Sequence, residues 1–218
     1  MKFEEAIIND KRTYISSYWS VIKYSQILIF TFYTNDDYND RLLKIALFFN
    51  SICLFITINS LFFNDSSMTH IYYEKGKYEF IYEIPKIILS SIITFIIKFT
   101  MSFLCLTHDK IKDLKKNENL EEINEKISKI YSCLKIKLVI FYVLLFILNC
   151  FYIYYTSIFC SVYNNTQLHL IKDSLISFVT NLIFPFLVVF FSTFLRLIAL
   201  KKNIKILYNI SKIIKLIS

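Results

Sequence analysis

Residues 138–160, LVIFYVLLFILNCFYIYYTSIFC, decide the fold class of this chain. They belong to a run of 34 residues, 138–171, that contains no Asp, Glu, Lys or Arg. An α-helix rises about 1.5 Å per residue and the hydrocarbon core of a bilayer is about 30 Å thick, so this stretch is long enough to cross a membrane. Its tyrosines gather toward the end, as aromatic residues do at a membrane interface. The stretch therefore predicts a transmembrane helix.

Three further stretches are comparably long and apolar, at 42–63, 84–106 and 174–196. Pro85 falls in the expected first turn of the second helix, where its missing N–H has no partner anyway. Pro185, near the middle of the fourth, predicts a kink. The whole chain has 218 residues, of which 56% are hydrophobic and 19% charged. We therefore expect an all-α integral membrane protein, a four-helix bundle with little room for a separate catalytic domain.

The distribution of Lys and Arg predicts the orientation in the membrane. Five lie in residues 1–41, eight in 107–137 and five after 200, whereas 64–83 holds two and 161–173 holds one. Because cytoplasmic loops carry the excess of Lys and Arg, this pattern predicts four crossings with both termini and the central link in the cytoplasm. The sequence does not indicate which membrane is crossed.

Three cytoplasmic segments are expected to form interfacial amphipathic helices before, between and after the spans. Residues 14–33 have too short an apolar core to cross, which favours a helix on the membrane surface. The link 107–137 predicts one or two helices bent around 117–119, which act as a solvated connector or bind a partner or a second copy. The tail 201–218 interleaves five lysines with isoleucines, so it should bind anionic lipids of the inner leaflet. Nucleic acid is not an expected partner, because topology alone accounts for the net charge of +8.

The two outer loops, 64–83 and 161–173, each contain one notable feature. Gly76 marks a tight turn, either in a short β-hairpin or after a short helix capped by Asp65, Ser66 or Thr69. The second loop brings together His169, Lys172 and Asp173, a candidate cluster for protons or ions. The alternative is that Asp173 or Ser174 caps the fourth helix while Lys172 faces lipid headgroups.

Polar residues inside the spans are functional candidates, because their burial in lipid is costly. Lys98, Arg196, Asn50 and Asn59 form the candidate polar membrane site. For Lys98 and Arg196 the alternative is that each long side chain reaches the cytoplasmic interface. The spans contain no Asp or Glu, which weakens a secondary-transporter hypothesis.

The sequence lacks the motifs of nucleotide-driven transport and serine hydrolysis, which need several glycines where this chain has one. Its three histidines are too scattered for a metal site. We therefore expect no catalytic residues, no cofactor and no metal. The expected function is a non-enzymatic membrane anchor or assembly module. The alternative is a small channel or transporter subunit, with a polar face from the first, second and fourth spans.

Four stretches of the sequence resemble a known kind of membrane region, and the resemblance covers nearly the whole chain. They are INDKRTYISSYWSVIK (8–23), NDDYNDRLLKIALFF (35–49), LFFNDSSMTHIYYEKGKYEFIYEIPKIILSSII (61–93) and VYNNTQLHLIKDSLISF (162–178). The chain resembles a multi-pass region at the C-terminal end of larger predicted membrane proteins of eukaryotic microbes with AT-rich genomes. The resemblance implies a shared fold and a fused upstream domain as the partner, and it assigns no catalytic residue. Separately, a pore would need a homo-oligomer, because four helices packed alone leave little central space.

Overall fold

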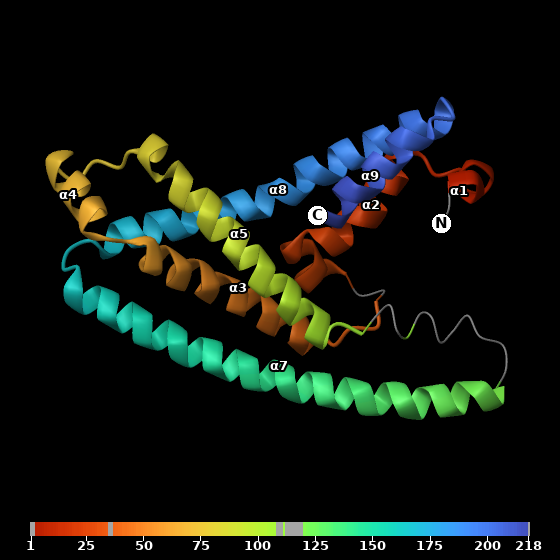
Figure 1. The fold of residues 1–218 in the computed structure, drawn as a ribbon, viewed down its shortest axis with the longest axis horizontal. Helices are drawn as coiled ribbons and strands as arrows, with labels where there is room; N and C mark the ends of the chain where they lie inside the picture. Colours follow the sequence, from red (N-terminus) through yellow and green to blue (C-terminus); the bar gives the residue numbers. More distant parts are fainter. Residues whose placement is uncertain (1–2, 35–36, 108–110, 112–119, 218) are drawn as a thin grey trace. The chain divides into compact units, whose positions relative to one another are not determined.

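The fold is all-α, as the sequence predicts. The computed structural model describes residues 3–34, 37–107, 111 and 120–217. It is 86% helical, and the described residues form no strand (Figure 1). The α-helices are α1 (Phe3–Asn9), α2 (Tyr14–Ser25), α3 (Arg41–Phe62), α4 (Asp65–Tyr73), α5 (Phe80–Cys105), α7 (Leu120–Val162), α8 (Gln167–Lys201) and α9 (Lys205–Ile217), with a π-helix, η1, at Ile29–Tyr33.

Four helices are long and apolar enough to cross a membrane, namely α3, α5, α7 and α8. The segment 14–33 is not among them, because it divides at Gln26 into the 12-residue α2 and the 5-residue η1. The described chain separates into two compact units, 36–178 and 1–35 with 179–218.

The unit formed by residues 36–178 is built around α3, which packs against both α5 and α7 (Figure 1). Asp40 is the N-cap of α3, because its side chain accepts a hydrogen bond from the backbone N–H of Leu42 at 3.1 Å. One apolar cluster joins the three helices, through Leu43 and Leu47 of α3, Met101 and Cys105 of α5, and Phe141 of α7. These contacts fix the three helices as one bundle.

Residues 64–83, which the sequence predicts to be the first outer loop, contain a helix, α4, and not a β-hairpin. Asn64 caps α4, because its side-chain oxygen accepts a hydrogen bond from the N–H of Ser67 at 3.0 Å. After α4 the chain reverses at Gly76, whose φ is +78° and whose N–H donates to the carbonyl of Ile71 at 2.9 Å. The turn at Gly76 is confirmed, and so is a short helix before it. The expected caps are wrong, because Asn64 is the N-cap and Asp65, Ser66 and Thr69 lie inside α4.

Several helix boundaries differ from the expected spans. The helix α5 begins at Phe80, so Pro85 is its sixth residue and lies past the first turn. The second half of the link and the third span form one 43-residue helix, α7. The expected bend at 117–119 lies outside the described residues. The helix α8 runs through Pro185 to Lys201.

The other unit combines the N-terminal helices with the second half of α8 and with α9. A small apolar cluster consists of Ala6 of α1, Ala199 of α8 and Tyr208 of α9. The ring of Phe3 lies 5.3 Å from that of Tyr208. Between α8 and α9 the chain turns at Asn203, which has a positive φ of 55°. The two ends of the sequence thus pack together in one unit.

Candidate functional site

A buried polar cluster joins three of the apolar helices in the unit 36–178. The side-chain nitrogen of Asn59 on α3 donates hydrogen bonds to the carbonyl of Phe55 at 2.9 Å and to the hydroxyl of Ser177 on α8 at 3.3 Å. The hydroxyl of Ser177 lies 3.3 Å from that of Ser90 on α5. Only Asn59 was predicted from the sequence. Ser90 also donates to the Ile87 carbonyl of its own helix, which is how serines in helices commonly bond, so nothing in the sequence distinguishes it.

Asn50 lies elsewhere on α3. Nine residues separate it from Asn59, and at 3.6 residues per turn this spacing places the two asparagines on opposite sides of the helix. Asn50 is buried and lines a cavity of about 130 Å³ together with Cys53, Thr57 and Tyr152. Among the described residues its side-chain nitrogen has no hydrogen-bond partner. The two asparagines therefore occupy different polar sites.

Lys98 is half-buried on α5, seven residues before the helix ends at Cys105. The structure places it in the same unit as Asn50 and Asn59 but in neither the asparagine–serine cluster nor the cavity of Asn50. Its location near the end of α5 suits a long side chain that extends toward an interface.

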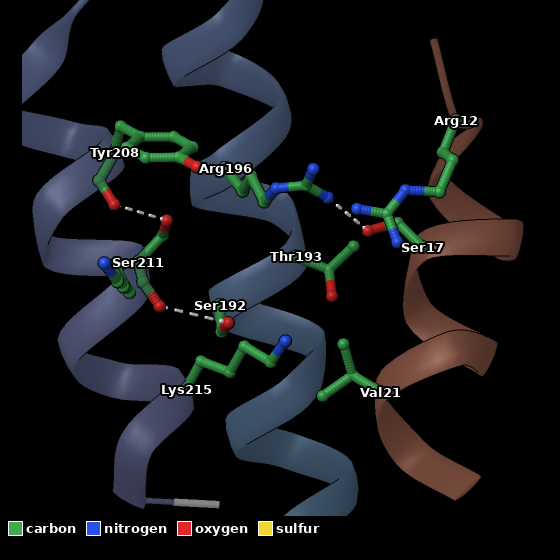
Figure 2. A pocket seen from close by; sticks show the side chains of 10 residues that line it. Arg12, Ser17, Val21, Ser192, Thr193, Arg196, Tyr208, Ser211 and Lys215 are labelled. Carbon is green, nitrogen blue, oxygen red and sulfur yellow. Dashed lines mark hydrogen bonds between the residues drawn. The ribbon is translucent and has the colours of Figure 1, made fainter. Parts of the chain in front are cut away.

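Arg196, the fourth residue of the predicted site, takes part in an ion-pair network within its own unit. Its Nη1 donates a hydrogen bond to the Ser17 hydroxyl of α2 at 2.6 Å (Figure 2), and its guanidinium pairs with Asp10. Arg12 pairs with the same carboxylate at 2.9 Å. The side chain of Asp10 is only 2% exposed. The spans expected from the sequence, 42–63, 84–106, 138–160 and 174–196, contain no acidic residue, and the counter-ion of Arg196 comes instead from the segment before α2.

A basic cavity of about 260 Å³ lies beside this network, between α2, α8 and α9 (Figure 2). Four of its lining residues are cations: Arg12, Arg196, Lys212 and Lys215. Desolvation, followed by the charges of Arg196 and Arg12, lowers the pKa of Lys215. We call this the basic cavity. Sequence reasoning assigned the lysines of α9 to a lipid-facing surface and missed the cavity, because its cations come from three separate parts of the chain.

The candidate cluster His169, Lys172 and Asp173 lies in the first two turns of α8, and Tyr78 lies beside it. The Tyr78 ring lies 6.4 Å from the ring of His169, and the Lys172 ammonium lies 5.9 Å from its centroid. Burial and the nearby carboxylate of Asp173 raise the pKa of Tyr78. Asp173 itself is buried.

The capping alternative for Asp173 and Ser174 is wrong, because α8 begins at Gln167 and both residues lie inside it. The hydroxyl of Ser174 donates to the Leu170 carbonyl of the same helix at 2.7 Å. In the described part of the chain, no group of three His, Cys, Asp or Glu side chains is placed to hold a metal ion.

Comparisons of this chain with known protein families, with curated proteins and with solved structures found no match. The four apolar helices are compatible with an integral membrane protein.

Proposed function

We propose that this chain is a non-enzymatic integral membrane protein that acts as an anchor or assembly module. Large apolar side chains of α7 support the membrane location, since Phe146 is 70% exposed and Ile153 is 63% exposed within the chain. Apolar patches of this kind are covered by lipid or by a partner and not by water. A second copy of the chain or a fused upstream domain would be the cargo that such an anchor assembles.

The observation that supports the proposal most strongly is the buried cluster of Asn59, Ser90 and Ser177. These polar side chains come from α3, α5 and α8, the three spans that a polar pore face would use, and all three are buried. Two contacts of 3.3 Å join them to one another. In lipid, hydrogen bonds of this type hold helices together. The polar groups thus serve the packing of the bundle, as an anchor requires.

The helix α9 fits the proposed place of the tail on the inner leaflet. At 3.6 residues per turn, Ile206, Ile210 and Ile213 lie along one side of α9, and all three are exposed. A basic helix with an exposed apolar side binds at the boundary between headgroups and acyl chains. In this proposal both termini and the link 107–137 lie on the cytoplasmic side.

Ion flux tests the anchor role. The full chain is reconstituted into liposomes loaded with a fluorescent ion indicator, beside empty liposomes and the variant Asn59→Leu. We expect the flux with either protein to equal that of empty liposomes, while both proteins resist extraction by alkaline carbonate. A flux that the wild-type chain supports and Asn59→Leu alters would contradict the anchor role and favour the channel.

Labelling of single cysteines tests the topology. In a variant without the five native cysteines, new cysteines replace the exposed residues Ser66 and Asn164, proposed outside, and Lys202, proposed inside. An impermeant maleimide should label the first two in intact cells and the third only after lysis. Labelling of Lys202→Cys from outside would reverse the proposed orientation.

The channel alternative has one observation in its favour. The side-chain nitrogen of Asn50 has no partner among the described residues and belongs to a cavity of about 130 Å³. At about 30 Å³ per water molecule, this space suits a few waters. Asn50→Leu separates the two functions, because it should abolish a water-filled path and leave an anchor inserted.

A further inference from the structure

The basic cavity has the charge and the size of a site for a compact anion. Its lining includes four cations, Arg12, Arg196, Lys212 and Lys215, and none of the described residues that line it is acidic. Its volume of about 260 Å³ is below the range of about 300–1,000 Å³ that is usual for pockets of drug-sized molecules. The cavity therefore suits a small, highly charged group.

Hydroxyl groups lie among the cations. Ser17, Ser192, Thr193 and Ser211 line the cavity, and all four are buried. The hydroxyl of Ser211 donates to the carbonyl of Tyr208 at 2.7 Å, and that of Ser192 donates to the carbonyl of Ser211 at 3.3 Å (Figure 2). The first bond lies within α9, and the second joins α8 to α9. The hydroxyl hydrogens of Ser192 and Ser211 are already donated to carbonyls, so the groups of this cavity that proteins use to bind phosphate oxygens are above all its guanidinium and ammonium groups.

The two arginines are held in place before any ligand arrives. Both pair with Asp10, and Arg196 also donates to Ser17 at 2.6 Å. A guanidinium held in one orientation loses little conformational entropy when it binds an anion. A single carboxylate pairs with both guanidinium groups, so one negative charge stands against the two positive charges that it contacts.

The helix α9 separates a lipid side from a cavity side. Tyr208, Ser211 and Lys215 line the cavity, whereas Ile206 and Ile213 lie on the opposite side of the helix and are exposed. If the isoleucines of α9 are buried at the boundary between headgroups and acyl chains, the cavity on the other side of the helix lies at the depth of the lipid phosphates.

We propose that the basic cavity binds a phosphate monoester group, as carried by an anionic lipid headgroup or by a soluble phosphate. The phosphate group carries a negative charge of between one and two units. In the cavity it would contact Arg196 and Arg12 on one side and Lys212 and Lys215 of α9 on the other. The lipid source rests on the proposed membrane placement of α9, whereas recognition of the phosphate group itself does not.

The first measurement is a titration of the full chain, in a neutral detergent, with inorganic phosphate. The shift in the melting temperature of the protein reports binding. The test variant is Lys212→Gln with Lys215→Gln, and the matched control is Lys205→Gln. All three lysines are exposed residues of α9, but Lys205 does not line the cavity. We expect the double variant to weaken phosphate binding at least about tenfold, which is about 1.4 kcal/mol, and Lys205→Gln to leave it within about twofold. Equal losses in both variants, or no saturable binding, would overturn the proposal.

The second measurement distinguishes the two sources. The full chain is placed in phosphatidylcholine nanodiscs that contain phosphatidic acid, or phosphatidylserine at the same surface charge. A melting temperature that rises more with phosphatidic acid, and loses this rise in the double variant, identifies the lipid as the ligand. Equal effects of the two lipids, together with saturable inorganic phosphate binding, identify a soluble phosphate.

The experiments can refute the anchor role and the phosphate site independently of each other. Ion flux through liposomes would refute the anchor role and leave the phosphate result unchanged. Absence of saturable phosphate binding would refute the site and leave insertion and topology as proposed.

Discussion

Asn59 on α3 donates a hydrogen bond to Ser177 on α8 across 3.3 Å, although 118 residues separate the two in sequence. The bond joins the first apolar span to the last in a buried environment, and Ser90 of α5 extends it to a third helix. In lipid the hydrophobic effect gives little preference for one helix pairing over another. A directional contact of this kind therefore helps to select how the spans pair.

The coupling between Asn59 and Ser177 can be measured with a double-mutant cycle of Asn59→Ala and Ser177→Ala. We expect a favourable coupling free energy of about 0.6 kcal/mol, and no more than about 1.7 kcal/mol, as is usual for hydrogen bonds between membrane helices. Unfolding of the chain by SDS in mixed micelles gives the free energies. The control cycle pairs Ser177→Ala with Asn149→Ala, because Asn149 donates to the Leu145 carbonyl of its own helix. A coupling of the same size in the control would contradict the prediction.

Ser177 also tests how tightly the helices pack. It is 0% exposed, so Ser177→Leu places a larger side chain at a buried position. We expect the free energy of unfolding to fall by about 1–3 kcal/mol. Ser157→Leu is the matched control, since Ser157 lies on an exposed position of α7 where lipid accepts the added side chain. Its stability should stay the same or increase. An unchanged stability of Ser177→Leu would show that α8 packs more loosely than described.

The buried ion pair of Lys44 and Asp37 should be sensitive to the loss of one partner. The Lys44 ammonium lies 2.5 Å from the Asp37 carboxylate, and both side chains are almost completely buried. Lys44→Met leaves a buried carboxylate without its cation, so we expect a loss of about 3–5 kcal/mol in the free energy of unfolding. The control Lys77→Met, at an exposed loop position, should change the stability little.

The second partner can then be removed as well. Adding Asp37→Asn to Lys44→Met should recover much of the lost stability, because no charge then remains buried at this site. A double variant as unstable as Lys44→Met alone would show that the lysine acts through packing and not through its charge.

Gly76 should tolerate Asn better than Val. Its φ of +78° lies in the left-handed region, and an added Cβ would meet no heavy atom within 4 Å, so the backbone conformation alone sets the cost. For Gly76→Val we expect a loss of about 1–2 kcal/mol, visible as faster amide exchange in α4. Asn adopts this conformation more readily, so Gly76→Asn should exchange more slowly than Gly76→Val. Equal exchange in the two variants would mean that φ does not determine the cost.

The apolar helices could be predicted from the sequence because length and hydropathy are properties of one contiguous stretch. The turn at Gly76 was predictable for the same reason, since φ is a local property. The choice between hairpin and helix before it was not, because it depended on whether Asn64 accepted the hydrogen bond that begins α4. The start of α8 at Gln167, before Asp173 and Ser174, was missed because several residues there could serve as the cap.

The polar sites were only partly predictable, because their partners are far apart in the chain. Ser177 and Ser90 carry no sequence signal that distinguishes them from other serines in helices. Arg196 was identified, but its partner Asp10 belongs to the N-terminal segment and lies outside every span. Residues that meet only after folding cannot be paired from spacing along the sequence.

The unbroken helix from Leu120 to Val162 has a mechanical consequence. At about 1.5 Å per residue its 43 residues extend over about 65 Å, roughly twice the thickness of the hydrocarbon core. Even at a steep tilt of about 40° the core accommodates only about 40 Å of helix, so some 25 Å must project beyond it. A stiff rod of this length acts as a lever: any load attached to its projecting end would turn the membrane-embedded portion as one body.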